Sequence, residues 1–507
     1  MENLSIISRM MRCIAWLGMS LLLLWSACSC GQQKVEEHLL PIVQKALNDT
    51  SSVYYADFSH FPEDYASLSI GIFDDDLSQF NVLEAFLTAD NFNNITGAEG
   101  ADGICDFAGE YFAYLADGAN ASYDVYLQRG NLDFLKETVV RNALFLLGDS
   151  YYNLALDEQP YGLKSRSKLL VCANATASAY GGQDVVTMLG QTQTKIPVVN
   201  LIDAAAGAFL KKVQGQGEAA VGILADPFVD DVAYYENAIR QKAAQMDFAG
   251  KIRFHNQKTF GVSEMMAPVQ GTSMLFDAAM RESQLGQQHP LPELGFGEGK
   301  IDITLMDRYN FDFTNGAMVY RLQNGFYTEL KINSAENLMR YYLVSLMEKY
   351  RKQENPYPLK AILLACPYAS ALRPVLEETL TTLREYKRNG VYLYHDVIAE
   401  DFCFIDPAQE VTRMTYELLR EQHRLALRGT ASEIETYVSM PTYGTPMEAL
   451  TPIGLFTEDY RYTRRSGTEI ITTKPVPLAY RYLSLTDLEQ LQRVAPTAYK
   501  LIVNQLY

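Results

Sequence analysis

The chain has 507 residues, 48% of them hydrophobic, which allows two or three domains and excludes a disordered or fibrous protein. Its formal net charge of -18 repels phosphate backbones and anionic lipid head groups, so we expect no nucleic-acid partner. The seven cysteines are too few and too scattered for a disulfide scaffold, and the absence of a CxxC pair argues against a metal site.

The amino terminus resembles a lipoprotein signal. Two arginines precede an apolar stretch, residues 14–25, that is too short to span a bilayer comfortably and runs into Ser-Ala-Cys. This pattern predicts a signal peptide over residues 1–27 and acylation of Cys28, with Cys30 as a second candidate. The alternative is a simple secretory peptide or an uncleaved anchor. We therefore expect a protein of the cell envelope, lipid-anchored in the periplasm or at the cell surface.

Short apolar runs alternate with longer amphipathic segments through most of the chain, which predicts α/β layers around mostly parallel sheets. The predicted strands are residues 67–73, 111–116, 168–173, 196–201, 220–225 and 361–365, and predicted helices include residues 233–246, 334–351 and 371–387. In such sheets ligands bind beyond the carboxyl ends of the strands, so the residues after each run are candidates for a site.

Residues 431–507 have a different pattern. Segments 436–441, 460–462 and 469–473 are predicted as strands among turns, so we expect a β-rich carboxyl-terminal extension.

Four strand ends carry polar motifs in a consistent order. They are residues 70–74 (IGIFD), 114–123 (YLADGANASY), 169–181 (LLVCANATASAYG) and 363–374 (LLACPYASALRP). In the same order, these segments resemble the IGxFDSG, YxGDxAxxPYG, IVIACNTATAYG and LxLGCTHYPLLRP motifs of the aspartate/glutamate racemase family, especially its long glutamate racemase-like members. The resemblance covers residues 67–425.

The resemblance implies an α/β fold with two pseudo-symmetric, doubly wound domains that close on a cleft. The expected organisation is a signal peptide (1–27), a tether and amino-terminal helix (28–64), domain A (65–196 with 391–430), domain B (197–390) and the carboxyl-terminal extension (431–507).

The family's reaction, inversion of an α-carbon, needs a base on one face and an acid on the other, and two cysteines supply them without a cofactor. Cys366 matches the second of these cysteines, but Asn174 occupies the position of the first, and an amide has no titratable proton. Cys172 lies two residues earlier, ~6.6 Å back along a strand. A direct proton transfer spans only ~3 Å, so two-cysteine inversion is expected to be impaired.

The site residues implied by the resemblance fall into two groups. The catalytic positions are Cys366, Asp74 and Asn174, and the substrate-binding positions are Asp75, Asp117, Ala175, Thr176, Pro367 and Tyr368. No metal and no cofactor are expected. Each catalytic position also has a structural interpretation: a small buried thiol for Cys366, a helix cap for Asp74 and a turn residue for Asn174.

Three functions fit this pattern. The first is an exported racemase-like lipoprotein that is impaired in racemisation and binds a ligand. The second is an active, cofactor-independent glutamate racemase, and the third is a one-cysteine enzyme like the decarboxylases of the same superfamily, with Cys366 as the acid. The expected partners are a small acidic amino acid or related carboxylate, the membrane through the lipid anchor and, as an alternative to a monomer, a second copy in a homodimer.

Overall fold

The computed structural model describes residues 39–62, 65–77, 80–215, 217–225, 231–266, 291–297, 299–426, 432–452, 454–468 and 470–506. The predicted signal peptide and Cys28 lie outside these ranges. All helices and strands described below belong to one compact unit, residues 41–507. Within the described ranges, no helix is both long enough and apolar enough to cross a bilayer.

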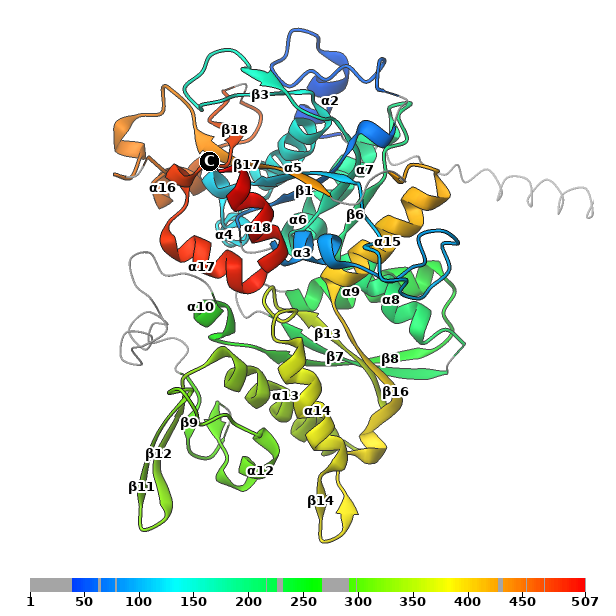
Figure 1. Cartoon of the computed structure of the whole chain (residues 1–507), viewed down its shortest axis with the longest axis vertical. Coiled ribbons are helices and arrows are strands. Elements are labelled where there is room, and N and C mark those ends of the chain that lie inside the picture. Colours follow the sequence, from blue (N-terminus) through cyan, green and yellow to red (C-terminus); the bar gives the residue numbers. More distant parts are fainter. Residues whose placement is uncertain are drawn as a thin grey trace, which may run out of the picture. The chain divides into compact units, whose positions relative to one another are not determined.

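The first sheet has six strands in the order β18, β17, β2, β1, β5, β6. Figure 1 labels β18, β17, β1 and β6 of this sheet. Its strands are β1 (Ser69–Asp74), β2 (Tyr111–Ala116), β5 (Ser167–Cys172), β6 (Val198–Asn200), β17 (Glu433–Pro441) and β18 (Thr473–Pro477). All neighbours are parallel except β17 and β18. β1 and β5 are buried along their whole length, which explains their nearly continuous apolar sequences.

Helices cover both faces of this sheet. They are α3 (Phe80–Thr88), α5 (Leu132–Leu147), α15 (Pro407–Glu421) and α18 (Pro496–Gln505). Ile70 and Ile72 of β1 share a core with α3, α15 and α18. α5 contacts β1, β2 and β5, and none of its side chains belongs to that core, so it covers the other face. Because strand side chains alternate between faces, Asp74 points to the same face as Ile72.

The second sheet has four parallel strands in the order β16, β13, β7, β8. Its strands and flanking helices are β7 (Glu218–Ala225), β8 (Lys251–Lys258), β13 (Leu359–Ala365), β16 (Ile398–Ile405), α8 (Leu201–Lys212), α9 (Asp231–Gln245), α13 (Ala335–Arg351) and α14 (Arg373–Glu385). Ile223 and Leu363 pack with α8 and α9, whereas Leu224 and Ile362 pack with α13 and α14. This sheet therefore has helices on both faces, and the predicted α/β class with parallel sheets is confirmed.

The pairing of two strands, β16 and β6, differs from the predicted domain boundaries. Residues 391–430 are expected in domain A, but β16 pairs with β13 in the second sheet. Domain B is expected to begin at residue 197, but β6 pairs with β5 in the first sheet. An apolar run predicts a strand without indicating which neighbour it pairs with, so the strand pairing at these two places could not be read from the sequence. α15, after β16, packs on both α3 and α8.

The carboxyl-terminal extension is built into the first sheet through β17 and β18. Its helices are α16 (Glu458–Thr463), α17 (Leu485–Val494) and α18. The strand predicted at residues 460–462 is wrong, because these residues lie in α16, and the extension contains more helix than strand. Tyrosine and threonine favour strands only where a neighbouring strand is available to pair with them.

The remaining elements are short. They are α2 (Pro41–Asn48), α4 (Tyr123–Gln128), α6 (Ala175–Tyr180), α7 (Gly182–Gly190), α10 (Val262–Met266), α12 (Met306–Tyr309), the hairpins β3 (Ser150–Tyr151) with β4 (Gly162–Leu163) and β14 (Lys387–Arg388) with β15 (Val391–Tyr392), and a small sheet of β9 (Glu293–Leu294), β10 (Lys300–Ile301), β11 (Met318–Gln323) and β12 (Phe326–Ile332).

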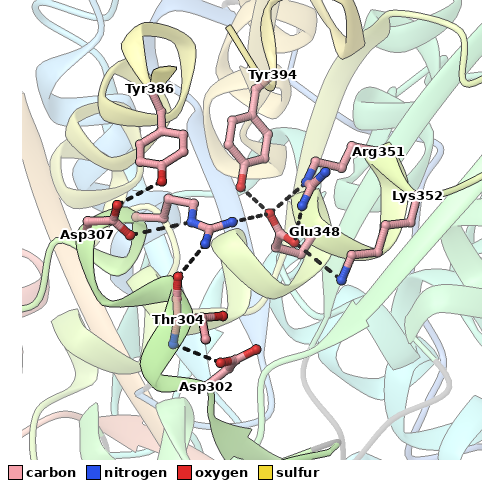
Figure 2. Close-up of polar contacts among 9 residues, drawn as sticks. Asp302, Thr304, Asp307, Glu348, Arg351, Lys352, Tyr386 and Tyr394 are labelled. Atoms are coloured by element: carbon pink, nitrogen blue, oxygen red, sulfur yellow. Dashed lines mark hydrogen bonds and ion pairs between the residues drawn. The ribbon is translucent and has the colours of Figure 1, made fainter. Parts of the chain in front are cut away.

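Glu348 of α13 is a buried carboxylate to which several polar side chains donate hydrogen bonds (Figure 2). Its carboxylate accepts two hydrogen bonds from Arg351, at 2.7 and 2.8 Å, one from Arg308 at 3.1 Å and one from the Tyr394 hydroxyl. The Lys352 Nζ lies 3.4 Å from Glu348 Oε2. Burial raises the pKa of Glu348, but the bonds from Arg351 and Tyr394 and the charges of Arg351 and Arg308 outweigh it and lower the pKa to about 2.

Glu348→Gln should lower the free energy of unfolding at pH 7 by about 3 kcal/mol, because it leaves the buried Arg308 without its buried counter-charge. The folded pKa of Glu348 lies below the unfolded value of about 4.3, so its stabilisation is complete above that pH and disappears as the pH falls toward 2. Urea denaturation between pH 7 and pH 2.5 measures the effect. The exposed Glu385→Gln on α14 is the control, and a loss that stays constant with pH would contradict the assignment.

Candidate active site

Three aspartates follow one another at the carboxyl end of β1. Asp74 is fully buried, and its Oδ1 accepts a hydrogen bond from the backbone N–H of Asp75 at 2.8 Å. Its Oδ2 has no hydrogen-bond partner among the described residues. Burial, followed by the negative charges of Asp75 and Asp76, raises the pKa of Asp74 well above its ordinary range. This strand end therefore resists a further negative charge.

Neutral donors hold Asp75. The Asn174 side-chain amide donates to Oδ1 at 3.0 Å, and the backbone N–H of Tyr123 donates to Oδ2 at 3.0 Å. Burial and the charge of Asp76 raise the pKa of Asp75 to about 8, although the bond from Tyr123 opposes this. Within the described ranges, no arginine, lysine or histidine forms an ion pair with Asp74 or Asp75.

Asn174 caps the amino terminus of α6. Its backbone is extended, and its Oδ1 accepts a hydrogen bond from the backbone N–H of Ala177 at 2.9 Å, while its Nδ2 donates to Asp75. Both ends of the amide are thus engaged in structural bonds. An asparagine at this place orders the turn after β5 but exchanges no proton.

Cys172 ends β5 and is fully buried. Its thiol lies 3.7 Å from the carbonyl oxygen of Asn174. Burial raises the pKa of Cys172 to about 12, and the nearby hydrogen bonds from Ser178 and Asn174 only reduce this effect. At neutral pH the side chain is a thiol, so it is a poor base.

Cys366 directly follows β13 and is 2% exposed, with its thiol 3.8 Å from the Ser263 hydroxyl. The next residue, Pro367, accepts a hydrogen bond through its carbonyl oxygen from the Asn81 amide of α3 at 3.0 Å. This bond joins the strand ends of the two sheets. Cys366, Asn81 and Ala175 line one cavity of about 30 Å³, which holds a water molecule or two but no amino acid.

The carboxyl-terminal extension reaches the same loop. Gln490 of α17 donates a hydrogen bond to the hydroxyl of the buried Tyr368 at 2.8 Å. The Glu84 carboxylate of α3 accepts hydrogen bonds from the backbone N–H groups of Thr497 and Ala498, in the first turn of α18. The extension therefore contacts the elements that carry both halves of the site.

Asp117 lies apart from the cavity beside Cys366. It is fully buried and accepts hydrogen bonds from the side chains of Asn120, Tyr123, Asn142 and Ser439. It forms part of the wall of another cavity, of about 340 Å³, together with residues 53–58, α5 and β18. Tyr123 links it to Asp75, because its hydroxyl donates to Asp117 and its backbone N–H to Asp75.

The structure thus brings together the predicted residues only in part. Asp75 bonds to Asn174, Thr176 donates to Asp124, and Ala175 shares a cavity with Cys366 and Pro367. The sequence motifs do not identify Asn81, Ser263 or Gln490, which contact this region from other elements. Asn81 has a weak signal, as a polar residue in the first turn after a predicted strand end. No local pattern marks Gln490.

No protein-family model and no curated protein matches the sequence. Among solved structures, glutamate racemase isoform RacE1 from Bacillus anthracis is similar with a TM-score of 0.38 and 14% identity, covering 73% of this chain and 88% of that one. The glutamate racemase from Campylobacter jejuni subsp. jejuni is similar with a TM-score of 0.35 and 15% identity, covering 75% of this chain and 94% of that one. The glutamate racemase from Thermus thermophilus, in complex with beta-chloro-D-alanine, is similar with a TM-score of 0.34 and 14% identity, covering 73% of this chain and 88% of that one. These values are too low to transfer any property of the racemases to this chain.

Asn174→Ala should lower the free energy of unfolding by about 2–3 kcal/mol, because it removes a helix cap and a donor to a buried carboxylate. Asn200→Ala is a matched control, because Asn200 caps α8 in the same way but donates to the exposed Asp203. Asn200→Ala should lower the free energy of unfolding by about 1 kcal/mol. Denaturant titration at pH 7 compares the two, and equal losses would show that the bond to Asp75 is unimportant.

Proposed function

We propose that the protein is an exported lipoprotein that binds a small ligand on a racemase-like fold and does not racemise amino acids with two cysteines. The observation that carries this proposal is Asn174, which stands where the family motif has its first cysteine and whose amide is bonded at both ends. No titratable group at this position can remove an α-proton opposite Cys366.

The neighbouring thiol supports the same conclusion. Cys172 would need to ionise near neutrality to act as the base, but burial raises its pKa to about 12. Asp74 and Asp75 disfavour an incoming α-carboxylate at this strand end, because burial and neighbouring negative charge already raise their pKa, and a further negative charge would add to that repulsion. A small acidic amino acid or related carboxylate would have to bind in a different manner from that of the family.

One observation favours a second candidate, a one-cysteine enzyme. Cys366 borders a small cavity and has the Ser263 hydroxyl beside it. A single thiol of this kind could deliver a proton from one face only. The difference between the two candidates is whether the α-proton of a substrate exchanges at all.

The decisive measurement uses D- and L-glutamate and D- and L-aspartate, each incubated separately with the purified protein in deuterated water. We expect neither α-deuteration nor inversion, because the site lacks a second titratable group. Deuterium with retained configuration, lost in Cys366→Ala but kept in the control Cys403→Ala, would instead establish the one-cysteine enzyme. Inversion that disappears in both Cys366→Ala and Cys172→Ala would refute the proposal.

The lipid anchor is tested separately. Cys28→Ser should abolish incorporation of a labelled fatty acid, whereas Cys30→Ser should leave it unchanged, because the small residues Ser26 and Ala27 directly precede Cys28. Gel fluorography of labelled cells measures the incorporation. The reverse result would move the cleavage site by two residues, and labelling that survives both changes would exclude the anchor.

A further inference from the structure

The three aspartates at the end of β1 have the spacing of an ion-binding site. One oxygen from each of Asp74, Asp75 and Asp76 lies within 4.8 Å of the others. Oxygen ligands lie about 2.1–2.6 Å from Mg²⁺ or Ca²⁺, so two ligands of the same ion are at most about 5 Å apart. Geometrically, one cation can therefore reach all three carboxylates.

Two buried polar atoms at this place also have no hydrogen-bond partner among the described residues. They are Asp74 Oδ2 and the hydroxyl of Tyr114, and both side chains are fully buried. Tyr114 lies beside Ile72 in the parallel register of β2 and β1, so its ring is on the same face as Asp74. Buried polar groups are normally paired, so two unpaired ones on the same face of the sheet point to a missing ligand.

The Tyr114 side chain is held in place by aromatic stacking. Its ring stacks on Phe80 at 4.4 Å between centroids, which fixes its position at the start of α3. Burial, and then the charges of Asp74, Asp76 and Asp75, raise the pKa of Tyr114 well above its ordinary value. The hydroxyl is carried on the face of the sheet to which Asp74 points. It belongs to a different strand, so it is an observation independent of the acidic sequence.

We propose that Asp74, Asp75 and Asp76 bind one divalent cation of the hard class, such as Mg²⁺, Ca²⁺ or Mn²⁺, with the Tyr114 hydroxyl directed at the ion or at a water molecule bound to it. Carboxylate oxygens are the ligands that these ions prefer. Hydrogen bonds from the Asn174 amide and from the backbone N–H of Tyr123 orient the Asp75 carboxylate, as outer-shell donors do in metal sites. This site goes beyond the proposed function and does not depend on it.

The competing explanation is that protons neutralise the cluster. Like charges in a low-dielectric interior are relieved either by a cation or by protonation of one or more carboxyl groups. The two explanations differ in their response to added metal, since only a cation site changes the stability of the protein at constant pH.

The test uses the full-length protein, purified in detergent and treated with EDTA. Mn²⁺ titration at pH 7.5, followed by electron paramagnetic resonance and calorimetry, should show one saturable site and a rise in melting temperature, with Mg²⁺ and Ca²⁺ competing. Asp76→Asn should weaken Mn²⁺ binding by about tenfold or more. Without metal, Asp76→Asn should still unfold in one cooperative thermal transition, as the metal-free wild type does. This separates loss of the site from misfolding.

Two further variants complete the design. Tyr114→Phe keeps the stacking on Phe80, removes only the hydroxyl and should weaken Mn²⁺ binding by about tenfold. Asp459→Asn, whose side chain on α16 is 99% exposed, changes the net charge equally and should leave binding unaltered. The proposal is overturned if the wild type binds no Mn²⁺ saturably, or if Asp76→Asn and Asp459→Asn bind it alike. Stability that rises from pH 8 to pH 6 without a response to any cation would assign the cluster to protons.

Discussion

Like charges repel strongly where water is excluded, and the fully buried strand β1 ends at Asp74, which is followed by the buried Asp75 and the half-buried Asp76. The surrounding chain meets this constraint with neutral donors: Asn174 from the turn after β5 and the backbone of Tyr123 after β2. The Tyr123 hydroxyl continues the network to Asp117. The ends of three neighbouring strands are therefore coupled through the need to stabilise buried carboxyl groups.

The carboxyl-terminal extension takes part in the same network. Ser439 of β17 donates to Asp117, so the added strand is tied to the first sheet by a buried hydrogen bond as well as by backbone pairing. At the other end of the extension, Gln490 bonds to Tyr368, beside the loop of Cys366, and the first turn of α18 bonds to Glu84. Elements of both sheets are therefore hydrogen-bonded to the one extension.

The chemistry at the strand ends differs from what a two-thiol reaction requires. A racemase of that kind needs thiols that ionise near neutral pH on both sides of a substrate. Here the thiol nearest the first position is held neutral by burial, and the position itself carries a bonded amide. The carboxyl groups concentrated beside it suit a positive ligand better than an anionic one.

The apolar runs of the sequence were sufficient to predict β1, β2, β5, β7 and β13, because burial on both faces requires continuous hydrophobic residues. The family resemblance made Asp74, Asn174 and Cys366 candidates, and all three follow or end predicted strands, where parallel sheets bind ligands. Only the tertiary structure decided that β16 joins the second sheet, that residues 460–462 are helical and that Asn81 and Gln490 contact the loop after β13. The physical reason is that periodicity reports which side of an element is buried, whereas its partners come from residues tens to hundreds of positions away.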